Sequence, residues 1–531
     1  MRLVFRTDAS LDIGTGHVMR CLTLARALRS EGTDCHFICR AFPGNLIARI
    51  GDLGFGVVAL SFAQSPDESG VQDAESLPAH AAWLGGDWRA DASNTATALQ
   101  SLRPDWLVVD HYALDRAWEL EVRPFCNNLM VVDDLVDRPH DCDLLLDQTF
   151  GRAEGDYAGL APHGCVVLAG TRYALLRPEF SALREHSLRR RASGVLRKIL
   201  VSMGGVDQMN ATGRVLQAVH QCTLPQDCRL TVLMGAQAPW LDEVRKQAAA
   251  LPWPCEVKVD ASNVAELVAD CDLAIGAAGG SAWERCALGV PSLLVVAAGN
   301  QQDVARSLER AGAARLLGGI DSIAMALPRV MAGIGSEALA GMSRAARGVC
   351  DGRGAGRVAG VLRNWRVQVR GMREDDLENV LRWRNHPDIR RRMYNSHEIS
   401  PSEHREWYAR SMRDQYRHLL IVEQAGIPLG FVQFTETGND GVADWGFYAV
   451  PGAPRGSGTK LGTAALDHAF RRLGFRKVRG EAIVSNEPSA VFHRKLGFAE
   501  EGIMRKRSSD GAACHDVLCF GMEASDWLER H

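Results

Sequence analysis

The sequence predicts an α/β protein of three domains, on three observations. The chain has 531 residues, and one domain usually takes about 100–200 residues. Over residues 1–365, short apolar runs alternate with amphipathic segments, as in parallel sheets that helices cover on both faces. After residue 365, two apolar runs flank a tight turn, which indicates a hairpin. We therefore expect domains at residues 1–175, 176–365 and 366–531.

The composition excludes several classes of protein. Hydrophobic residues make up 46% of the chain and charged residues 24%, and the net charge of -3 implies no general affinity for nucleic acid. The chain has no apolar run of 18 residues and lacks a signal-peptide pattern at its N-terminus, so we expect a cytoplasmic protein without membrane insertion. Its 14 cysteines include no CxxC pair, and we expect free thiols rather than disulfides or a zinc site.

A glycine loop near the N-terminus is the feature around which the first domain is organised. Residues 3–5 predict a strand, and periodic apolar residues ending at Gly32 predict a helix. The loop between them contains Gly14, Thr15 and Gly16. This order aims backbone N–H groups and a helix N-terminus at one point, which suits a phosphate, and His17 can move a proton there. A structural glycine turn beside a surface histidine is the alternative.

The other elements of the first domain follow in order. Strands are predicted at residues 34–39, 56–60, 106–112 and 129–135, and helices at residues 46–53 and 96–102. Ligands of parallel sheets bind beyond the carboxyl ends of the strands. The polar residues at such ends are Arg6, Asp8, Asp110, His111, Tyr112, Asp133 and Asp134. We expect Arg6 and Asp8 to flank a substrate, whereas Asp133 and Asp134 are equally consistent with a capped turn.

The second domain repeats the plan of strand, glycine turn and helix. Four arginines at its start, Arg184, Arg189, Arg190 and Arg191, predict a solvated helix or connector. Residues 198–219 form the first unit, with Gly204 and Gly205 at the turn and Asp207 and Asn210 as helix caps. Strands follow at residues 230–235 and 255–259.

A second glycine loop lies between residues 264 and 302. A strand at residues 272–275 precedes the loop, a helix at residues 283–288 follows it, and a further strand occupies residues 292–296. The loop contains Gly276, Gly279, Gly280 and Ser281. From the residues alone, it either binds phosphate or only packs in an ordinary α/β domain.

The run FRTDASLDIGTGHVMRCLTLA, residues 5–25, resembles the N-terminal signature of the UDP-sugar hydrolases of the pseudaminic acid pathway. These enzymes remove UDP from a diacetamido-trideoxy-altrose nucleotide. They are related to MurG-type glycosyltransferases, with two Rossmann-like domains in the GT-B arrangement. The resemblance implies that His17 is the catalytic base, that Tyr112 and Asp110 lie in the active site, and that the anomeric C–O bond breaks with inversion.

The second glycine loop resembles the UDP site of MurG-like enzymes. That resemblance implies that its amides hold the diphosphate, that Glu284 bonds the ribose, and that Asn300 and Gln301 face the sugar. Helix ends and amides can hold UDP without a metal, so we expect no metal requirement. A glycosyltransferase that passes the sugar to an acceptor is the alternative.

The third domain resembles the GNAT acetyltransferases, which have an α+β fold. A glycine loop and an amphipathic helix at residues 451–475 follow a strand at residues 443–450. The resemblance implies that acetyl-CoA is a co-substrate and that the strand before the loop splays from its neighbour. Its cofactor-binding residues would be Tyr448, Val450, Arg455, Gly456, Gly458, Lys460, Gly462 and Asn486, although Lys460 stands where the common pattern has glycine or alanine. His493 stands where many of these enzymes have a tyrosine acid, and it is either that acid or a surface histidine.

The segments LRWRNHPDIRRRM and EHREW resemble the N-acetyltransferase of the same pathway and also the ribosomal-protein N-terminal acetyltransferases. The first of these acetylates the 4-amino group of a UDP-linked amino sugar, the step before UDP removal. We therefore predict a bifunctional enzyme that acts twice on one UDP-amino-sugar and uses acetyl-CoA. The alternative for this domain is a protein acetyltransferase or an acetyl-CoA-sensing module. The oligomeric state is left open.

Overall fold

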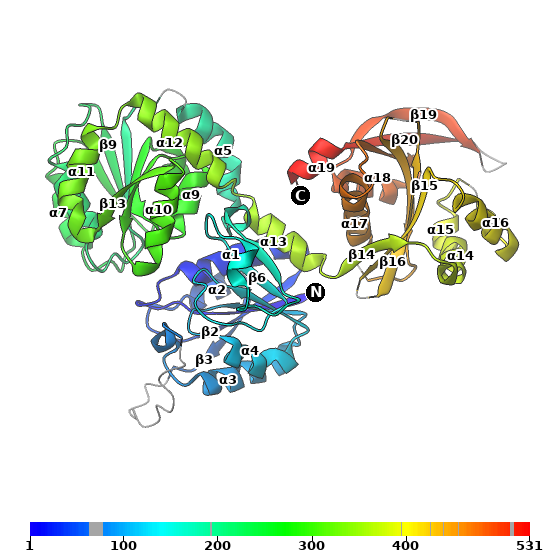
Figure 1. The fold of residues 1–531 in the computed structure, drawn as a ribbon, viewed down its shortest axis with the longest axis horizontal. Coiled ribbons are helices and arrows are strands. Elements are labelled where there is room, and N and C mark those ends of the chain that lie inside the picture. Colours follow the sequence, from blue (N-terminus) through cyan, green and yellow to red (C-terminus); the bar gives the residue numbers. More distant parts are fainter. Residues whose placement is uncertain are drawn as a thin grey trace. The chain divides into compact units, whose positions relative to one another are not determined.

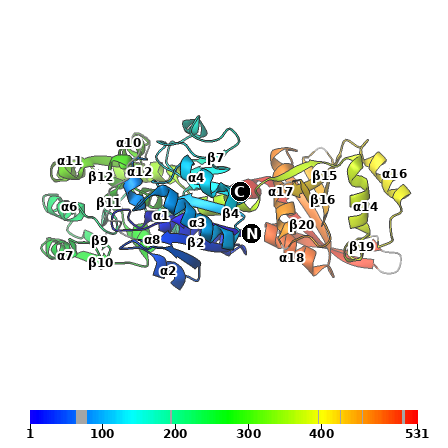
Figure 2. The ribbon, with the colours of Figure 1, turned by 90° about the horizontal axis from the view of Figure 1, so that it is seen from below.

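The computed structural model describes residues 1–62, 78–191, 194–394, 396–424, 426–438, 440–454, 456–509 and 514–530. Contacts divide the chain into two compact units, Met1–Ala359 and Gly360–His531, which Figures 1 and 2 colour from blue to green and from yellow-green to red. The first unit contains two parallel sheets and the second contains one mainly antiparallel sheet. The predicted α/β class is confirmed, and the domain boundaries expected at residues 175 and 365 stay predictions.

The first sheet places the ends of two central strands side by side. Its order is β3-β2-β1-β4-β5-β6-β7, with every neighbouring pair parallel. The strands are β1 (Arg2–Thr7), β2 (Asp34–Arg40), β3 (Gly56–Leu60), β4 (Trp106–Asp110), β5 (Asn128–Val132), β6 (Leu144–Asp147) and β7 (Val166–Ala169). The order reverses between β1 and β4, and Thr7 lies opposite Asp110. A ligand site is expected at such a switch point, beyond the carboxyl ends of the strands.

Helices cover this sheet, and the structure corrects two of the boundaries predicted for its elements. The helices are α1 (Gly16–Arg29), α2 (Ile47–Asp52), α3 (Trp88–Leu102) and α4 (Arg116–Val122), with a short 3₁₀ turn η1 (Ala81–Leu84). The helix predicted at residues 96–102 begins at Trp88, because Asp87 caps it by accepting a hydrogen bond from the Ala90 N–H. The strand predicted at residues 106–112 ends at Asp110, where the chain turns.

The second sheet has the order β10-β9-β8-β11-β12-β13 and is also parallel. Its strands are β8 (Lys198–Ser202), β9 (Arg229–Met234), β10 (Cys255–Val259), β11 (Leu273–Ala277), β12 (Ser292–Val296) and β13 (Ala314–Gly319). The surrounding helices are α5 (Pro178–Arg190), α6 (Ala211–Val219), α7 (Leu241–Ala249), α8 (Val264–Asp270), α9 (Ser281–Ala287), α10 (Gln302–Arg310), α11 (Ile323–Ala332) and α12 (Ser336–Val349). Helix α13 (Gly354–Arg363) follows them along the chain. Asn210 and Asp207 cap α6 as predicted.

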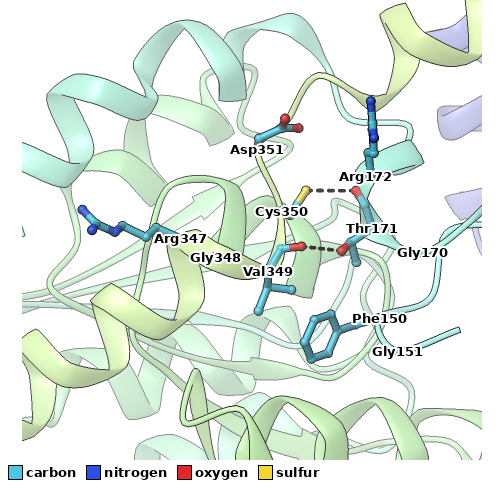
Figure 3. A pocket seen from close by; sticks show the side chains of 10 residues that line it. All are labelled: Phe150, Gly151, Gly170, Thr171, Arg172, Arg347, Gly348, Val349, Cys350 and Asp351. Carbon is cyan, nitrogen blue, oxygen red and sulfur yellow. Dashed lines mark hydrogen bonds between the residues drawn. The ribbon is translucent and has the colours of Figure 1, made fainter. Parts of the chain in front are cut away.

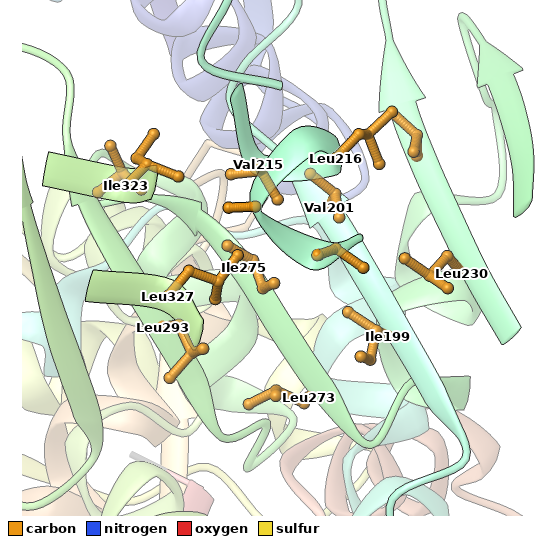
Figure 4. Close-up of a cluster of buried hydrophobic side chains, with 14 of the residues drawn as sticks. Ile199, Val201, Val215, Leu216, Leu230, Leu273, Ile275, Leu293, Ile323 and Leu327 are labelled. Carbon is orange, nitrogen blue, oxygen red and sulfur yellow. The ribbon is translucent and has the colours of Figure 1, made fainter. Parts of the chain in front are cut away.

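Aliphatic side chains from strands and helices form the core of this second sheet. Figure 4 shows Val201 of β8 and Ile275 of β11 between Val215 of α6 and Leu327 of α11, and all four are buried. Burying one such side chain stabilises the fold by about 1.5–3 kcal/mol. The continuous apolar strands that predicted a parallel sheet thus form its interior.

Two of the four arginines at the start of the second half, Arg184 and Arg191, bond backbone carbonyls, which corrects the prediction for them, whereas Arg189 is 71% exposed on α5 as predicted. Arg191 is only 5% exposed and donates hydrogen bonds to the carbonyls of Val268, Ala269 and Cys271 at the end of α8. Arg184 likewise donates to the carbonyl oxygen of Cys350. Carbonyls at a helix C-terminus lack partners within the helix, and the five N–H donors of a guanidinium can satisfy several of them. These arginines therefore join α5 to neighbouring helices.

The third sheet has the order β14-β15-β16-β17-β18-β20-β19. Its strands are β14 (Val367–Gly371), β15 (Arg417–Gln424), β16 (Ile427–Glu436), β17 (Val442–Ala449), β18 (Lys477–Ile483), β19 (Ala499–Ser509) and β20 (Cys514–Glu523). Its helices are α14 (Leu377–Asn385), α15 (Pro387–Arg390), α16 (Pro401–Ser411), α17 (Ser457–Arg471), α18 (Glu487–Leu496) and α19 (Ala524–Arg530). β17 pairs with β18 only at its first three residues, while its pairing with β16 continues to Ala449. The predicted splay between β17 and β18 is therefore confirmed.

The structure also describes the state of the cysteine thiols and the lengths of the apolar helices. The 13 cysteines whose side chains the structure describes are all free, as predicted. Within the described part of the chain, no single helix is long and apolar enough to cross a membrane. One strongly bent pair, Ile320–Ala332 and Ser336–Arg363, meets that criterion by length and composition only.

Candidate functional site

His17 and Asp110 meet at the switch point of the first sheet. His17 lies in the first turn of α1, and its Nδ1 is 2.6 Å from Oδ1 of Asp110 at the end of β4. Burial alone would raise the pKa of Asp110, but the Arg20 guanidinium and His17 outweigh it and hold that pKa well below its ordinary value. Asp110 is therefore ionised and accepts a hydrogen bond from Nδ1–H of His17. The opposite ring nitrogen, Nε2, then presents a lone pair that can accept a proton.

Arg20 extends this pair into a network. Its Nε and Nη2 each donate to one oxygen of Asp110 at 2.7 Å, and its Nη1 donates to Oδ2 of Asp134. The Tyr112 hydroxyl donates to the same Asp134 oxygen at 2.9 Å, and burial raises the pKa of Tyr112 well above its ordinary value. The sequence reasoning missed Arg20. Its position three residues after His17, on the same face of one helix, was the available signal.

Aromatic rings line one side of His17. The Tyr112 ring lies edge-on to the His17 ring with centroids 4.5 Å apart, and Trp83 of η1 stacks on Tyr112 at 5.8 Å. The ring centroids of His80 and Trp83 lie 4.5 Å apart, and burial lowers the pKa of His80. The sequence reasoning missed His80 and Trp83, which belong to a connection without periodicity or a recognisable motif. Only their residue types, capable of stacking on a sugar face, could have suggested them.

Arg6 and Asp8 lie beneath the site and do not face a ligand, which corrects the expectation that they flank the substrate. Both side chains are 0% exposed and pair with each other at 2.8 Å. Arg6 also donates to Asp91, and Asp8 accepts from the backbone N–H of Arg40. A buried charge needs partners of this kind, and helix α3 and the end of β2 supply them here. The pair therefore supports the loop after β1 from below.

The remaining acidic and histidine candidates also have structural partners. Nδ1 of His111 accepts a hydrogen bond from the Ala113 N–H, and burial lowers the pKa of His111 to about 4. Asp133 pairs with Arg138 at 2.9 Å and accepts from the Tyr157 hydroxyl. His111 and Asp133 therefore bond to the protein just after the ends of β4 and β5, whereas Asp134 belongs to the His17 network.

The first glycine loop leaves the start of α1 available to an anion. Gly14 has φ +76°, a conformation that favours glycine, and Thr15 precedes α1 without making a side-chain cap. The first turn of α1 contains no acidic residue. Among the described residues, this helix N-terminus therefore keeps N–H groups that no side chain caps, and its dipole favours negative charge.

The loops of the second sheet lie at its carboxyl edge. Gly204 and Gly205 are exposed after β8, and Gln208 of the same connection donates to the Leu11 carbonyl in the loop after β1 at 3.2 Å. The structure therefore brings the connection after β8 to the first glycine loop. Within the described residues, no hydrogen bond, ion pair or ring contact joins Glu284 or Asn300 to His17, and a common site for them stays a prediction.

Glu284 and Gln301 flank the second glycine loop. Ser281 begins α9 after Gly279 and Gly280, and Nε2 of Gln301 lies 3.6 Å from the position that a Cβ on Gly279 would take. Burial raises the pKa of Glu284 to about 7, and its nearest cation is Arg177 at 3.9 Å. Asn300 is exposed in the turn before α10. Because only a cation 3.9 Å away offsets its charge, the Glu284 carboxyl group can accept hydrogen bonds from hydroxyl groups.

A cavity of about 350 Å³ lies elsewhere in the first unit. Figure 3 shows it between the segment of Gly170, Thr171 and Arg172 and the end of α12, where Thr171 bonds to the Val349 carbonyl. None of the predicted site residues lines it. It belongs to the connections between the two sheets and not to the His17 network.

In the second unit, a glycine-containing turn opens α17. Gly456 has φ +96° at the N-cap, and Gly458 lies in the first turn. A Cβ on Gly462 would lie 2.7 Å from Phe492 and Leu496, so Gly462 permits packing of α17 on α18 rather than contact with a cofactor. Lys460 donates to Oε1 of Gln424 at 2.7 Å. The predicted contact Arg455 lies outside the described residues.

Three further predicted residues in this unit have partners within the fold, and the cofactor contacts of Val450 and Asn486 stay predictions. Val450 uses its N–H to bond the Leu429 carbonyl, so it does not offer that group to a thioester. The Asn486 side chain caps α18 by accepting from the Ser489 N–H. His493 is 1% exposed, and therefore is not a surface histidine.

The role of His493 as an acid is not supported either. Its Nδ1–H donates to the Ser489 carbonyl at 2.8 Å, and its Nε2 accepts from Nε1–H of Trp445 at 3.1 Å. Burial lowers the pKa of His493 to about 4, so the ring is neutral near pH 7. Tyr448, by contrast, lies beside the splay with its ring tilted by 32° to that of Phe431, and burial raises its pKa. A neutral tyrosine hydroxyl can donate a proton there.

Comparison with known proteins assigns relatives to both units. Residues 366–499 match the family model described as an acetyltransferase (GNAT) domain. Over 136 residues the chain is 28% identical to an SPbeta prophage-derived uncharacterized N-acetyltransferase of Bacillus subtilis, which covers 25% of this chain and 76% of that protein. The second unit thus carries a GNAT domain, as predicted.

The first unit is similar to a sugar-nucleotide hydrolase. Over 316 residues the chain is 25% identical to the UDP-2,4-diacetamido-2,4,6-trideoxy-beta-L-altropyranose hydrolase of Campylobacter jejuni, covering 59% of this chain and 97% of that enzyme. It is 22% identical over 299 residues to an uncharacterized protein of Methanocaldococcus jannaschii, covering 56% of this chain and 55% of that protein. The chain thus spans about half the length of the archaeal relative. The predicted fusion of a hydrolase-like part with a GNAT domain is confirmed, and both similarities support enzymatic activity.

Proposed function

We propose that this chain is a bifunctional nucleotide-sugar enzyme. Its GNAT domain acetylates the 4-amine of UDP-4-amino-4,6-dideoxy-N-acetyl-β-L-altrosamine with acetyl-CoA. Its first unit hydrolyses the product, UDP-2,4-diacetamido-2,4,6-trideoxy-β-L-altropyranose, to UDP and the free sugar. The observation that carries the hydrolase half is the His17–Asp110 pair beside an uncapped helix N-terminus, in the part similar to the bacterial hydrolase.

The geometry at His17 supports water as the nucleophile. Asp110 accepts from Nδ1–H of His17, so Nε2 can take a proton from a water molecule as that water attacks the anomeric carbon. The C–O bond to UDP breaks, and the departing diphosphate gains stabilisation from N–H groups at helix starts. Attack opposite the leaving group inverts the anomeric centre. No step in this scheme calls for a metal ion.

The GNAT half transfers an acetyl group to an amine. The N–H groups at the start of α17 would hold the pyrophosphate of acetyl-CoA, and the splay of β17 from β18 would admit the pantetheine arm. The neutral amine attacks the thioester carbonyl, and the C–S bond breaks as the C–N bond of the amide is completed. The nitrogen loses one proton to solvent, and the departing thiolate gains one and leaves as a thiol. Tyr448 is the residue beside the splay that we propose for this proton transfer.

A mass-spectrometric assay tests both halves together. The protein is incubated with the UDP-linked 4-amino sugar, with and without acetyl-CoA, and all nucleotide and sugar products are quantified. We expect the diacetamido sugar and equimolar UDP only when acetyl-CoA is present. Accumulation of acetylated UDP-sugar without UDP release would indicate a glycosyltransferase that awaits an acceptor. Absence of both products would contradict the proposed substrate.

A further inference from the structure

Arg20 occupies the centre of the network around His17. Three of its nitrogen atoms bond two carboxylates, Asp110 from the end of β4 and Asp134 from the connection after β5. Its side chain is 11% exposed, so these bonds form where water competes weakly. A bidentate guanidinium–carboxylate pair fixes orientation as well as charge. The geometry therefore holds Asp110 in one rotamer, with Oδ1 toward His17.

We propose that Arg20 is a positioning residue for the hydrolytic reaction, acting through Asp110 to hold the His17 imidazole in one orientation, with its proton on Nδ1 and its lone pair on Nε2. This inference rests on the proposed hydrolase function. Without the guanidinium, Asp110 would lose the bidentate partner that fixes its rotamer, and it could turn away from Nδ1 of His17. The ring could then carry its proton on Nε2, which would have no lone pair to accept a proton from water. Arg20 thus preserves the base without touching the substrate.

Asp134 gives this arrangement a second anchor. Its Oδ2 accepts from both Arg20 and the Tyr112 hydroxyl, so one carboxylate fixes the guanidinium and the ring that lies edge-on to His17. Movement of Arg20 would therefore disturb both Asp110 and Tyr112. The charged and titratable groups that surround His17 are Asp110, Arg20, Tyr112, His80 and His111.

The experiment compares Arg20→Met with Arg26→Met as the matched control. Arg26 lies on the same helix, and its side chain is exposed. For each protein we would measure kcat and KM for UDP release across pH 5–9. We would also record long-range ¹H–¹⁵N spectra of histidine rings, with His17 assigned through a His17→Gln variant. We expect Arg20→Met to lower kcat roughly 10²-fold at every pH, with little change in KM.

The ring spectra and chemical rescue separate positioning from a merely structural role. We expect His17 to change from the Nδ1–H tautomer to a mixture of the two neutral tautomers in Arg20→Met, and added guanidinium to restore activity relative to equal sodium chloride. Unchanged His17 signals with kcat within about twofold of wild type, or a loss of activity without change at His17, would overturn the proposal. If Arg20→Met does not fold, Arg20→Lys and Asp134→Asn are tested with the same readouts. Lysine cannot reproduce the bidentate bond, so we expect intermediate changes.

The two proposals can fail separately. If the wild-type protein releases no UDP from the UDP-sugar, the hydrolase function is wrong. The ring spectra still decide whether Arg20 controls the protonation of His17, because they need no substrate. Arg26→Met should match the wild type in every measurement.

Discussion

At the scale of residues, two side chains of the same type differ in function because their hydrogen-bond partners differ. His17 and His493 are both histidines in first or last turns of helices, yet only His17 has a carboxylate on one ring nitrogen and a lone pair on the other. His493 is bonded at both nitrogens within a core. Chemistry at the first unit therefore centres on one residue.

We expect His17→Ala to lower UDP release by at least about 10²-fold, because it removes the proton acceptor for water. Acetyl transfer should stay within about twofold of wild type, since the GNAT domain has its own core. Parallel assays of UDP and of CoA release on one preparation measure both effects. Equal loss of the two activities would contradict separate sites.

Glu284 gives a pH-dependent prediction. Burial raises its pKa to about 7, so the carboxyl group is mostly neutral below that pH and ionised above it. If the carboxylate accepts bonds from ribose hydroxyls, UDP binding should strengthen from pH 6 to pH 8 and release a proton. Isothermal titration calorimetry in buffers of different ionisation enthalpy measures this. A Glu284→Gln variant should lose the dependence, and an unchanged pH profile in that variant would exclude the assignment.

At the scale of elements, the strand–loop–helix units were predictable because their signals are local. The strands at Gly56–Leu60, Cys255–Val259 and Ser292–Val296 match the predicted limits, since apolar runs end there at turn residues. Hydrogen-bond partners that lie on segments distant in the sequence were not predictable. In the sequence, Arg191 belongs to a basic run that is typical of a solvated segment, but in the fold the carbonyls at the end of α8 accept its hydrogen bonds. The carboxylate partners of Arg20 likewise lie far away in the sequence, on β4 and in the connection after β5.

The start of α17 gives a prediction for one element. A Cβ on Gly458 would meet only Phe492, at 3.8 Å, so the fold tolerates a side chain there, whereas a larger one would occupy the space expected for the pyrophosphate. We expect Gly458→Leu to weaken acetyl-CoA binding by at least about tenfold, or 1.4 kcal/mol, and to spare UDP release. Binding is measured by calorimetry. Unchanged affinity would contradict the loop assignment.

At the scale of the whole molecule, the chain has two units with separate cores, to which we assign the two proposed chemistries. Met1–Ala359 contains the hydrolase-like sheets and Gly360–His531 the GNAT sheet. The sequence predicted the class of each unit from its pattern of strands and helices and from family motifs. It could not predict the aromatic side chains at His17, because Trp83 and His80 come from an irregular connection that only the tertiary fold brings near.

Independent units predict independent unfolding. We expect differential scanning calorimetry to resolve two transitions, of which acetyl-CoA raises one and UDP the other. A ligand at about 100 times its Kd stabilises its own unit by about 2.7 kcal/mol. A single transition that both ligands shift equally would contradict separate binding units.

The central claim, that water attacks the anomeric carbon of a UDP-sugar with His17 as the base, is tested most directly by hydrolysis in ¹⁸O-labelled water. The mass of the released UDP shows which bond breaks, since phosphate oxygens do not exchange with solvent under these conditions. Cleavage of the sugar C–O bond predicts unlabelled UDP from the wild type and almost no UDP from His17→Ala. Label in the UDP, or undiminished release from the variant, would contradict the account.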